Sequence, residues 1–526
     1  MHYTLVTIQV MRMLMTPSRR GVTITAGALV LSVTAAKLCL HLYAGRSYGF
    51  FVDELYYMAC AHHLAWGYVD QPPLIAAMAW LVLHLLGDSL PALRFLPAVA
   101  GAAEVALTAL IARQMGGKRF AQALAAIAVL VAPGILGLDN LFTMNAFEPV
   151  IWLACANLAI RIVKTGKQRL WIWFGLLAGV GLENKYSMLL FGGGIVVGLV
   201  LTLQRRAFTS PWLWIAGALA LLLFLPNLMW NAQHHFPFLE LQQNIRRSGR
   251  DVPLGPVAFF AQEALAMHPL TVPLWLAGLW FYFFSRAGRA FRTLGWAWLF
   301  TAAAIVAMSP RIYYLFPAYP LLFAGGAVWW ERVLARPRAV WLQFAWPGLL
   351  LVTGALLAPI AIPILSPANY IAYTRWLHLE QPRLETQKLG PLPQIFADQF
   401  GWREMTATVA RVYNGLPPEV RTKTAIFGQN YGQAGAIDRF GPEYGLPPAI
   451  SGHQSYFLWG PGHYTGESII VMDGRRRDLE QNCTTVQDAA HVEHPYSMPY
   501  EHFDVFYCTG LKTPLRELWP KLKSWD

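Results

Sequence analysis

Eleven apolar runs, most of them long enough to cross a bilayer as a helix, dominate the first two thirds of this 526-residue chain. A helix needs roughly 20 such residues to span the hydrocarbon core. The runs therefore predict a polytopic α-helical membrane protein, and they exclude a disordered, collagen-like or coiled-coil chain. They lie at 21–44, 93–113, 120–138, 143–163, 170–182, 186–203, 211–230, 269–284, 291–308, 312–331 and 339–364.

A further apolar run, 73–87, is too short for a span and is bounded by Pro72-Pro73 and Gly87-Asp88. We interpret it as a helix that lies in the membrane interface. Counting it as a span would place every later loop on the opposite side of the membrane.

The formal net charge of +12 is unevenly distributed. Residues 1–365 contain 26 Lys and Arg against 12 Asp and Glu, whereas residues 366–526 contain 15 against 17. Nucleic-acid binding needs a solvated basic face, so a basic excess confined to loops between apolar runs disfavours it. With the N-terminus inside, eighteen Lys and Arg, among them Arg12, Arg19 and Arg20, lie on the inner side and seven on the outer side. The positive-inside rule then predicts a membrane protein with a cytoplasmic N-terminus and an outer C-terminal part.

The composition becomes globular at Ser366, which predicts two domains, a transmembrane domain at 1–365 and an extracytoplasmic domain at 366–526. Short strand-like runs alternate with helical or turn-rich stretches in the second domain, as is typical of a small α/β or α+β fold. These strand-like runs are Thr424–Phe427, Ser468–Met472 and Val505–Tyr507.

Five cysteines in a chain of this length exclude a disulfide scaffold. Two of them, Cys483 and Cys508, are the only cysteines of the C-terminal domain. An oxidising outer compartment would allow them to pair, and two free thiols are the alternative.

The first outer loop combines acidic and aromatic residues in the run FVDELYYMACAHHLAWGYVDQPPL, Phe51–Leu74. A carboxylate near the bilayer centre costs about 2.5–3.5 kcal/mol, so the acids of a membrane domain are informative. Asp53 and Glu54 open this run among large apolar residues, where desolvation favours a carboxylate of raised pKa that acts as a general base. A solvated helix cap is the alternative for Asp53.

Five segments in order resemble a large family of polytopic glycosyltransferases, which includes bacterial aminoarabinose transferases and protein O-mannosyltransferases. This family has the GT-C fold and uses polyprenyl-phosphate sugars. Two stretches of the C-terminal domain, GQNYGQAGAIDRFG and SGHQSYFLWGPG, carry a weaker resemblance. The five segments are the first outer loop, GLDNLFTMNAFEP (Gly137–Pro149), GLENKYS (Gly181–Ser187), PNLMWNAQHHFPF (Pro226–Phe238) and SPRIYYLFPAYPLL (Ser309–Leu322).

The resemblance implies an inverting displacement in which the acceptor attacks the anomeric carbon and the lipid phosphate leaves. It assigns Asp53 as general base and Glu54 as its support or an acceptor contact. Asp139 would position the sugar or the base, with a helix cap as the alternative. Asp70 and Tyr57 would support the site or contact the acceptor.

Binding of the donor phosphate and sugar is implied for six further residues. The alternatives are an ion pair with Glu183 for Lys185, an interfacial anchor for Arg311, and an aromatic belt for Tyr313 and Tyr314. The set comprises Lys185, Arg311, Tyr313, Tyr314, His234 and His235.

The expected partners are a polyprenyl-phosphate-linked sugar, a lipid, glycan or protein acceptor, and membrane lipids, with no nucleic acid. No cofactor is expected, and no spacing resembles a zinc signature, so no metal is assigned. A transporter or flippase for a lipid-linked or small substrate is the alternative function, although no internal repeat of the kind common in transporters is visible.

Overall fold

The computed structural model describes residues 25–308, 311–381 and 385–526. Arg12, Arg19, Arg20, the start of the first predicted span and the first two residues of the SPRIYY motif lie outside the described residues. Contacts divide the chain into two compact units. Unit 1 comprises Met1–Arg46, Arg94–Pro226 and Pro253–Ile364, and unit 2 comprises Ser47–Leu93, Asn227–Val252 and Leu365–Asp526.

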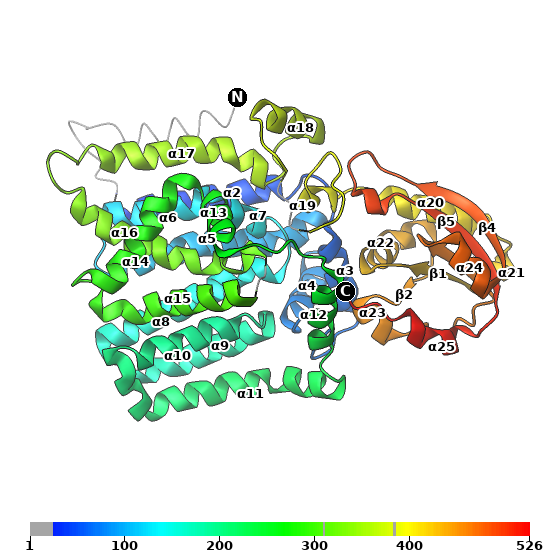
Figure 1. Cartoon of the computed structure of the whole chain (residues 1–526), viewed down its shortest axis with the longest axis horizontal. Helices are drawn as coiled ribbons and strands as arrows, with labels where there is room; N and C mark the ends of the chain where they lie inside the picture. The colour runs from blue at the N-terminus through cyan, green and yellow to red at the C-terminus, as the bar shows by residue number, and fades with distance from the viewer. Residues whose placement is uncertain (1–24, 309–310, 382–384) are drawn as a thin grey trace. The chain divides into compact units, whose positions relative to one another are not determined.

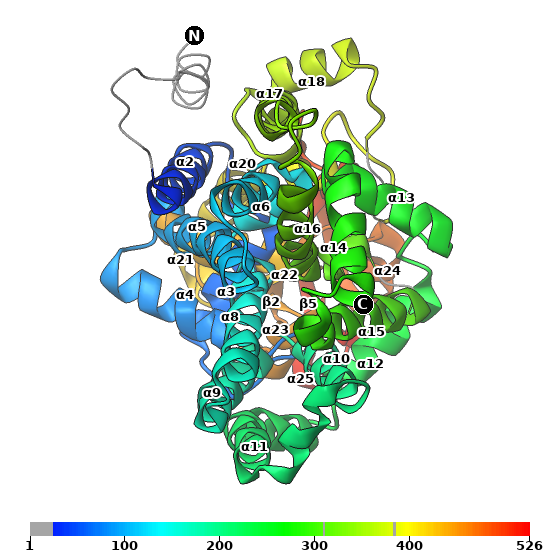
Figure 2. The ribbon, with the colours of Figure 1, turned by 90° about the vertical axis from the view of Figure 1, so that its left-hand side faces the viewer.

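Unit 1 is a bundle of apolar helices (Figure 1), most of which Figure 2 shows end-on. In the described part of the chain, 7 helical segments are long and apolar enough to cross a membrane. The chain is therefore a multi-pass membrane protein. The helices of these segments are α2 (Ala26–Ala44), α5 (Leu90–Gln114), α8 (Met144–Thr165), α11 (Pro211–Gln233), α15 (Arg292–Met308), α16 (Tyr319–Val333) and α17 (Leu342–Ala361).

Three more predicted spans are helix pairs with a sharp bend, by 66°, 106° and 102°. In the first pair the bend falls at Pro133, whose missing N–H and fixed φ interrupt the helical ladder. The pairs are α6 (Arg119–Val131) with α7 (Pro133–Asp139), α10 (Met188–Val200) with the short helix Leu203–Thr209, and α13 (Pro256–Ala266) with the segment that contains α14 (Val272–Phe284).

The count of eleven spans is corrected to at most 10 among the described residues. The run predicted at 170–182 does form a helix, α9 (Trp171–Asn184), but its 14 residues are too few to span the hydrocarbon core. The interfacial run forms α4 (Leu74–Leu85), an apolar helix that is also too short to cross. Its position at the membrane surface stays a prediction.

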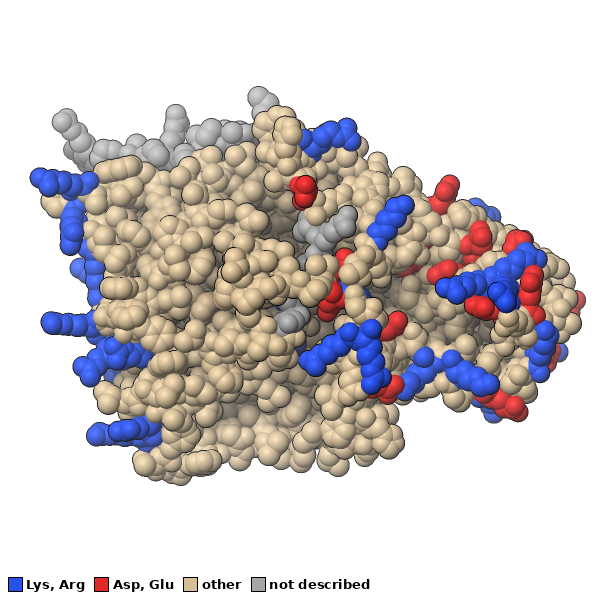
Figure 3. Space-filling view, in the orientation of Figure 1, with Lys and Arg blue, Asp and Glu red and all other residues tan. Residues whose placement is uncertain are grey.

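Charged side chains are distributed unequally over the helical unit. On the face that Figure 3 shows, Lys and Arg gather at one end of the bundle, at the left, and the broad surface beside them carries almost no charge. This pattern suits a hydrocarbon-facing surface with a basic rim. The direction in which the bundle crosses the membrane stays a prediction.

Unit 2 contains a mixed five-stranded sheet of order β2-β1-β3-β5-β4. β1 is parallel to β2 and β3, and β5 runs antiparallel to β3 and β4. The three strands expected from the sequence are confirmed as β1, β3 and β5, whereas the two-residue β2 and the largely exposed β4 were not predicted. The strands are β1 (Thr424–Gly428), β2 (Ile450–Ser451), β3 (Ser468–Met472), β4 (Cys483–Val492) and β5 (Phe503–Leu511).

Helices surround this sheet, and apolar side chains such as Phe427, Val471 and Trp519 form part of the core. Segments 47–93 and 227–252 pack with 365–526 in the same unit. The division into domains at 1–365 and 366–526 stays a prediction. The helices of unit 2 are α3 (Val52–His62), α4, α12 (Pro237–Ser248), α18 (Pro367–Trp376), α19 (Gln394–Ala397), α20 (Trp402–Asn414), α21 (Pro418–Arg421), α22 (Tyr431–Phe440), α23 (Gln454–Trp459), α24 (Arg476–Asn482) and α25 (Leu515–Leu518).

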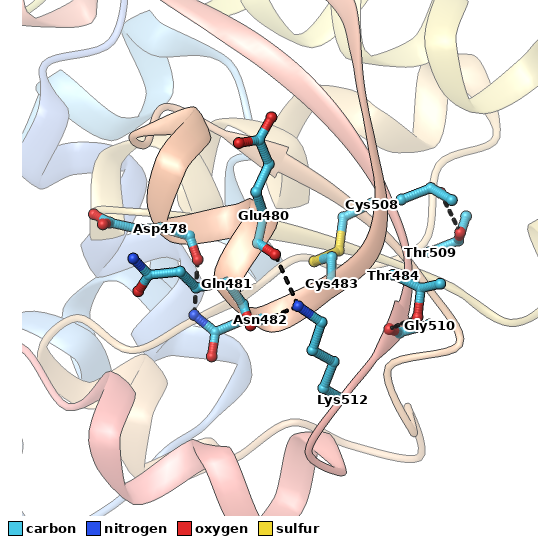
Figure 4. Close-up of a disulfide and its surroundings, with 11 residues drawn as sticks. Asp478, Glu480, Gln481, Asn482, Cys483, Thr484, Cys508, Thr509, Gly510 and Lys512 are labelled. Carbon is cyan, nitrogen blue, oxygen red and sulfur yellow. Dashed lines mark hydrogen bonds between the residues drawn. A yellow bond between two sulfur atoms is a disulfide. The ribbon is translucent and has the colours of Figure 1, made fainter.

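A disulfide joins Cys483 at the start of β4 to Cys508 in β5, with 6.0 Å between their Cα atoms (Figure 4). Beside it, the Lys512 ammonium donates to the backbone carbonyls of Glu480 and Gln481 at 2.9 and 3.0 Å. The bond therefore links the two antiparallel strands at the edge of the sheet, next to the end of α24.

Removing this disulfide should destabilise unit 2 by about 3 kcal/mol, because closing a loop of this length restricts the unfolded chain. We expect Cys483→Ser/Cys508→Ser to lower the midpoint of thermal unfolding without changing the far-UV spectrum. Non-reducing mass spectrometry of protein from its native membrane should find both thiols blocked, and two free thiols would contradict the pairing.

Candidate functional site

Asp53 and Glu54 lie in the first turn of α3, where the helix dipole favours negative charge. The Glu54 carboxylate is completely buried and accepts the Phe51 backbone N–H at 2.8 Å. Glu54 therefore caps the helix and fixes the start of α3. Its role as an acceptor contact stays a prediction.

The Asp53 carboxylate accepts a hydrogen bond from the Tyr431 hydroxyl at 2.7 Å. Tyr57, one turn further along α3, is buried, and burial followed by the Asp53 charge raises the pKa of its hydroxyl. Tyr57 therefore stays neutral and can act only as a hydrogen-bond group beside the carboxylate. In unit 2, the Asp53 carboxylate thus lies beside the phenol side chains of Tyr431 and Tyr57 and is partly shielded from water.

Asp70 is the second carboxylate of this group. The Tyr56 hydroxyl donates to Asp70 Oδ1 at 2.9 Å, and it lies 2.7 Å from the Ser455 hydroxyl. Burial, and to a smaller extent the nearby Asp53 charge, raise the pKa of Asp70 to about 7. The structure therefore groups three of the predicted residues, Asp53, Tyr57 and Asp70.

Further acids of unit 2 act on the same region. Burial and then the charges of Glu501, Asp53 and Glu385 raise the pKa of Asp398 well above its usual range. Arg250 offsets part of this negative charge through an ion pair with Glu385 at 2.8 Å. Among the described residues, no group of three or more His, Cys, Asp or Glu side chains could hold a metal ion.

The two histidines predicted for the donor lie at the end of α11. His234 Nδ1 is 2.8 Å from the Trp230 carbonyl, and its ring stacks on Trp230 with 4.1 Å between centroids. His235 is exposed and adopts a left-handed backbone with φ of 60°. Neither histidine has a contact that assigns it to the donor, so this role stays a prediction.

Lys185 is the centre of a polar group in unit 1. Its ammonium donates to Asn145 Oδ1 at 2.7 Å and pairs with Glu148 Oε2 at 2.9 Å. Ser187 donates to the other oxygen of Glu148. The ion pair of Lys185 is therefore with Glu148 and not with Glu183.

The rings of Tyr313 and Tyr314 stack on each other and lie near the Lys185 ammonium. Their centroids are 4.8 Å apart, and the ammonium is 4.4 Å from the Tyr314 ring and 5.5 Å from the Tyr313 ring. Arg311 is half-buried directly before the short helix Ile312–Tyr314. The structure thus brings a cation and two aromatic rings together, which is a suitable surface for an anionic or sugar-bearing ligand.

Asp139 is held in a different group of unit 1. Its carboxylate lies 2.6 Å from the Lys37 ammonium, which is also 3.5 Å from Glu104. All three side chains are buried. Asp139 lies against α5, because a Cβ at Gly101 would come within 2.7 Å of Asp139 Oδ2. The ion pair with Lys37 accounts for the burial of the Asp139 carboxylate. A role of Asp139 in positioning the sugar stays a prediction.

The chain is similar in sequence and in fold to known glycosyltransferases. Residues 70–230 match the model of the family described as dolichyl-phosphate-mannose-protein mannosyltransferase. The crystal structure of ArnT from Cupriavidus metallidurans bound to undecaprenyl phosphate is 13% identical, with a TM-score of 0.59 over 90% of this chain and 97% of that one. The resemblance to the GT-C glycosyltransferases is confirmed. The apo structure of ArnT agrees, with 14% identity and a TM-score of 0.55.

Among curated proteins, the chain is similar to the lipid A galacturonosyltransferase RgtD of Rhizobium johnstonii, with 28% identity over 230 residues. The match covers 40% of this chain and 48% of RgtD. The chain therefore spans about half the length of the curated relative that it matches.

Several residues that lie close to the predicted ones were not predicted from the sequence. Tyr431 and Ser455 reach Asp53 and the Tyr56–Asp70 pair, and both occur in the two C-terminal stretches that carry the weaker resemblance. Lys37 was missed as well, although a lone cation inside the apolar run 21–44 is a usable signal for a buried partner.

Asp70→Asn should make the stability of the protein less dependent on pH. A carboxyl whose pKa is raised on folding stabilises the fold below its unfolded pKa, and this contribution is lost as pH rises through about 7. We expect the unfolding midpoint of the wild type to fall between pH 5 and pH 8, and that of the variant to fall by a few degrees less. Scanning calorimetry in nanodiscs measures this difference.

The matched control is Asp478→Asn, which changes an exposed aspartate of the same unit. Its pH dependence should follow the wild type. An Asp70→Asn curve parallel to the wild type would show that Asp70 does not exchange its proton in this range.

Proposed function

We propose that this chain is an inverting glycosyltransferase that moves a sugar from a polyprenyl-phosphate donor to an acceptor at the outer face of the bacterial cytoplasmic membrane. The observation that carries the proposal is the Asp53 carboxylate, which accepts the Tyr431 hydroxyl next to buried Tyr57 in a chain with the fold of ArnT. The disulfide between Cys483 and Cys508 supports an oxidising compartment around unit 2.

In the proposed reaction Asp53 accepts the proton of an acceptor hydroxyl as its oxygen attacks the anomeric carbon. The new bond joins the acceptor oxygen to that carbon, and the bond from the carbon to the phosphate oxygen breaks. The sugar is joined to the acceptor with inverted anomeric configuration, and polyprenyl phosphate leaves as an anion. For unit 1 by itself, the proposed role is binding of the donor phosphate by Lys185, which has Tyr313 and Tyr314 beside it.

Lys185→Met should raise the donor KM about ten-fold or more, because one charge-assisted contact to phosphate is lost. The substitution also leaves the buried Glu148 without its cation. Lys185→Met/Glu148→Gln removes that second effect and serves as the control. Steady-state kinetics with a purified donor measures both variants, and a donor KM equal to that of the wild type in both would remove Lys185 from the donor site.

The acceptor is proposed by chemical class. RgtD is named for lipid A, and we therefore propose a glycolipid of this kind as the first acceptor to test. Lipid mass spectrometry of a deletion strain should find a glycolipid that lacks one sugar. An unchanged lipid profile together with a changed glycoprotein or cell-wall glycan would reject the lipid acceptor.

A flippase or transporter is the second candidate function. The observation that favours it is the buried group of Lys37, Glu104 and Asp139 inside the helical bundle, since charges within membrane helices commonly mark transport pathways. Membranes incubated with a radiolabelled polyprenyl-phosphate sugar separate the two functions. Free polyprenyl phosphate together with a labelled product supports transfer, and label that crosses the membrane while attached to its lipid supports transport.

A further inference from the structure

One motif of unit 2 contacts the proposed base from a distant part of the chain. The stretch GQNYGQAGAIDRFG runs from Gly428 to Gly441 and contains Tyr431, the first residue of α22. The Tyr431 hydroxyl donates to Asp53 Oδ1 at 2.7 Å across a sequence separation of 378 residues. A contact of this kind does not arise from local chain geometry and depends on how distant segments of unit 2 pack.

The packing of α22 on α3 places Tyr431 next to Asp53. Two glycines in α22 permit this close approach. A Cβ at Gly432 would come within 2.4 Å of Val52 Cγ2, and a Cβ at Gly435 would come within 3.1 Å of the Leu55 backbone. Asn430 caps the helix, because its side-chain oxygen accepts the Gln433 N–H at 2.8 Å. The motif therefore fixes both the start of α22 and its distance from α3.

Two rings hold the side chain of Tyr431 in one orientation. The ring of Tyr56 contacts the Tyr431 ring, with 4.7 Å between centroids. The ring of His453 stacks on the Tyr431 ring, with 4.9 Å between centroids and 9° between the ring planes. The Tyr431 backbone N–H donates to His453 Nδ1 at 3.1 Å, and Asp526 Oδ1 lies 3.3 Å from His453 Nε2. The phenol is thus held by its backbone and by its ring, and its hydroxyl points at Asp53.

We propose that Tyr431 is a positioning residue for Asp53, an inference that rests on the proposed function. Its hydroxyl fixes the rotation of the carboxylate and stabilises the charged form, which is the form that accepts a proton. Burial and the Asp53 charge raise the pKa of Tyr431 well above its usual range, so the phenol remains a donor at neutral pH. The C-terminal part of the chain would in this way complete the catalytic group of the first outer loop.

Tyr431→Phe keeps the aromatic ring and removes only the hydroxyl that donates the hydrogen bond to Asp53. We expect kcat to fall about ten-fold and the KM for the sugar donor to stay within about two-fold of the wild type, because the proposed role of Tyr431 is to orient Asp53 and not to bind the donor phosphate. Loss of this hydrogen bond raises the pKa of Asp53. The acidic limb of the pH–kcat profile should therefore move to higher pH by about one pH unit. The other groups that act electrostatically in this region are Tyr57, Asp70 and Asp398, with Arg250 near Tyr431.

Tyr456→Phe is the matched control. Tyr456 is also a buried tyrosine of unit 2 and donates to a carboxylate, that of Asp438 at 2.5 Å, which has no place in the proposed site. Its pH–kcat profile should coincide with that of the wild type. A shift of the same size in Tyr456→Phe would attribute the effect to general destabilisation and would overturn the proposal.

A second variant tests the inference without loss of a contact. Incorporation of 3-fluorotyrosine at position 431 makes the hydroxyl a stronger donor and should move the acidic limb downward. Unchanged limbs in both Tyr431 variants, with Asp53→Asn inactive, would overturn the role of Tyr431 and leave the proposed function in place. Full turnover in Asp53→Asn would instead overturn the proposed base, and the positioning role would fall with it.

Discussion

Asp53→Asn is expected to lower the rate of sugar transfer by about 10²–10⁴-fold, the usual contribution of a positioned general base. Asparagine has the shape of aspartate and can still accept the Tyr431 hydroxyl, which lies 2.7 Å from the native carboxylate. It cannot accept the proton of an acceptor hydroxyl. The fold should therefore persist while the chemical step is lost. Turnover of a radiolabelled donor by the purified protein measures the effect.

The control is Asp88→Asn, which changes another aspartate of the segment 47–93 of unit 2. The side chain of Asp88 is largely exposed and pairs with Arg439 at 3.2 Å. An exposed ion pair contributes little to stability, so this variant should behave as the wild type. Near-normal turnover of purified Asp53→Asn would remove Asp53 as the base.

Lys37→Met should destabilise the helical bundle by about 3–5 kcal/mol, because it leaves two buried carboxylates without their cation. Lys37 lies 2.6 Å from Asp139 and 3.5 Å from Glu104, and all three side chains are buried. We expect a much lower yield of folded protein and a lower unfolding midpoint in detergent. Fluorescence-detected size exclusion with a thermal ramp measures both.

The double variant Lys37→Met/Asp139→Asn separates an ion pair from a packing defect. It removes one of the two unpaired charges, and it should recover part of the lost stability. If the double variant were no more stable than Lys37→Met, the ion pair would not account for the effect. Asp139→Asn alone then reports whether Asp139 has any role in transfer beyond this pairing.

The parts of the fold that follow local sequence patterns were predicted well. Apolar runs of about 20 residues identify spans because the hydrocarbon core fixes the length of a crossing helix. Bends within a run are harder to predict, since a break such as that before Pro133 depends on packing as well as on the proline. The run at 170–182 was counted as a span although it is shorter than the roughly 20 residues that a crossing helix needs, and it forms the 14-residue helix α9.

The candidate site was predicted only where its residues share a segment. Asp53, Tyr57 and Asp70 lie in one loop, and their proximity was expected from the sequence. Tyr431 is 378 residues away from Asp53 along the chain, and no local pattern relates the two. The pairing of Lys37 with Asp139 is of the same kind, because it depends on which helices become neighbours in the bundle.

The most direct test of the proposed inverting transfer is the stereochemistry of a single turnover. Purified protein in nanodiscs receives a polyprenyl-phosphate sugar of known anomeric configuration, and proton NMR of the product reads the anomeric coupling. Displacement with Asp53 as base predicts complete inversion, release of one polyprenyl phosphate for each sugar transferred, and loss of both signals in Asp53→Asn. A product with retained configuration, or product formed at full rate by Asp53→Asn, would contradict it.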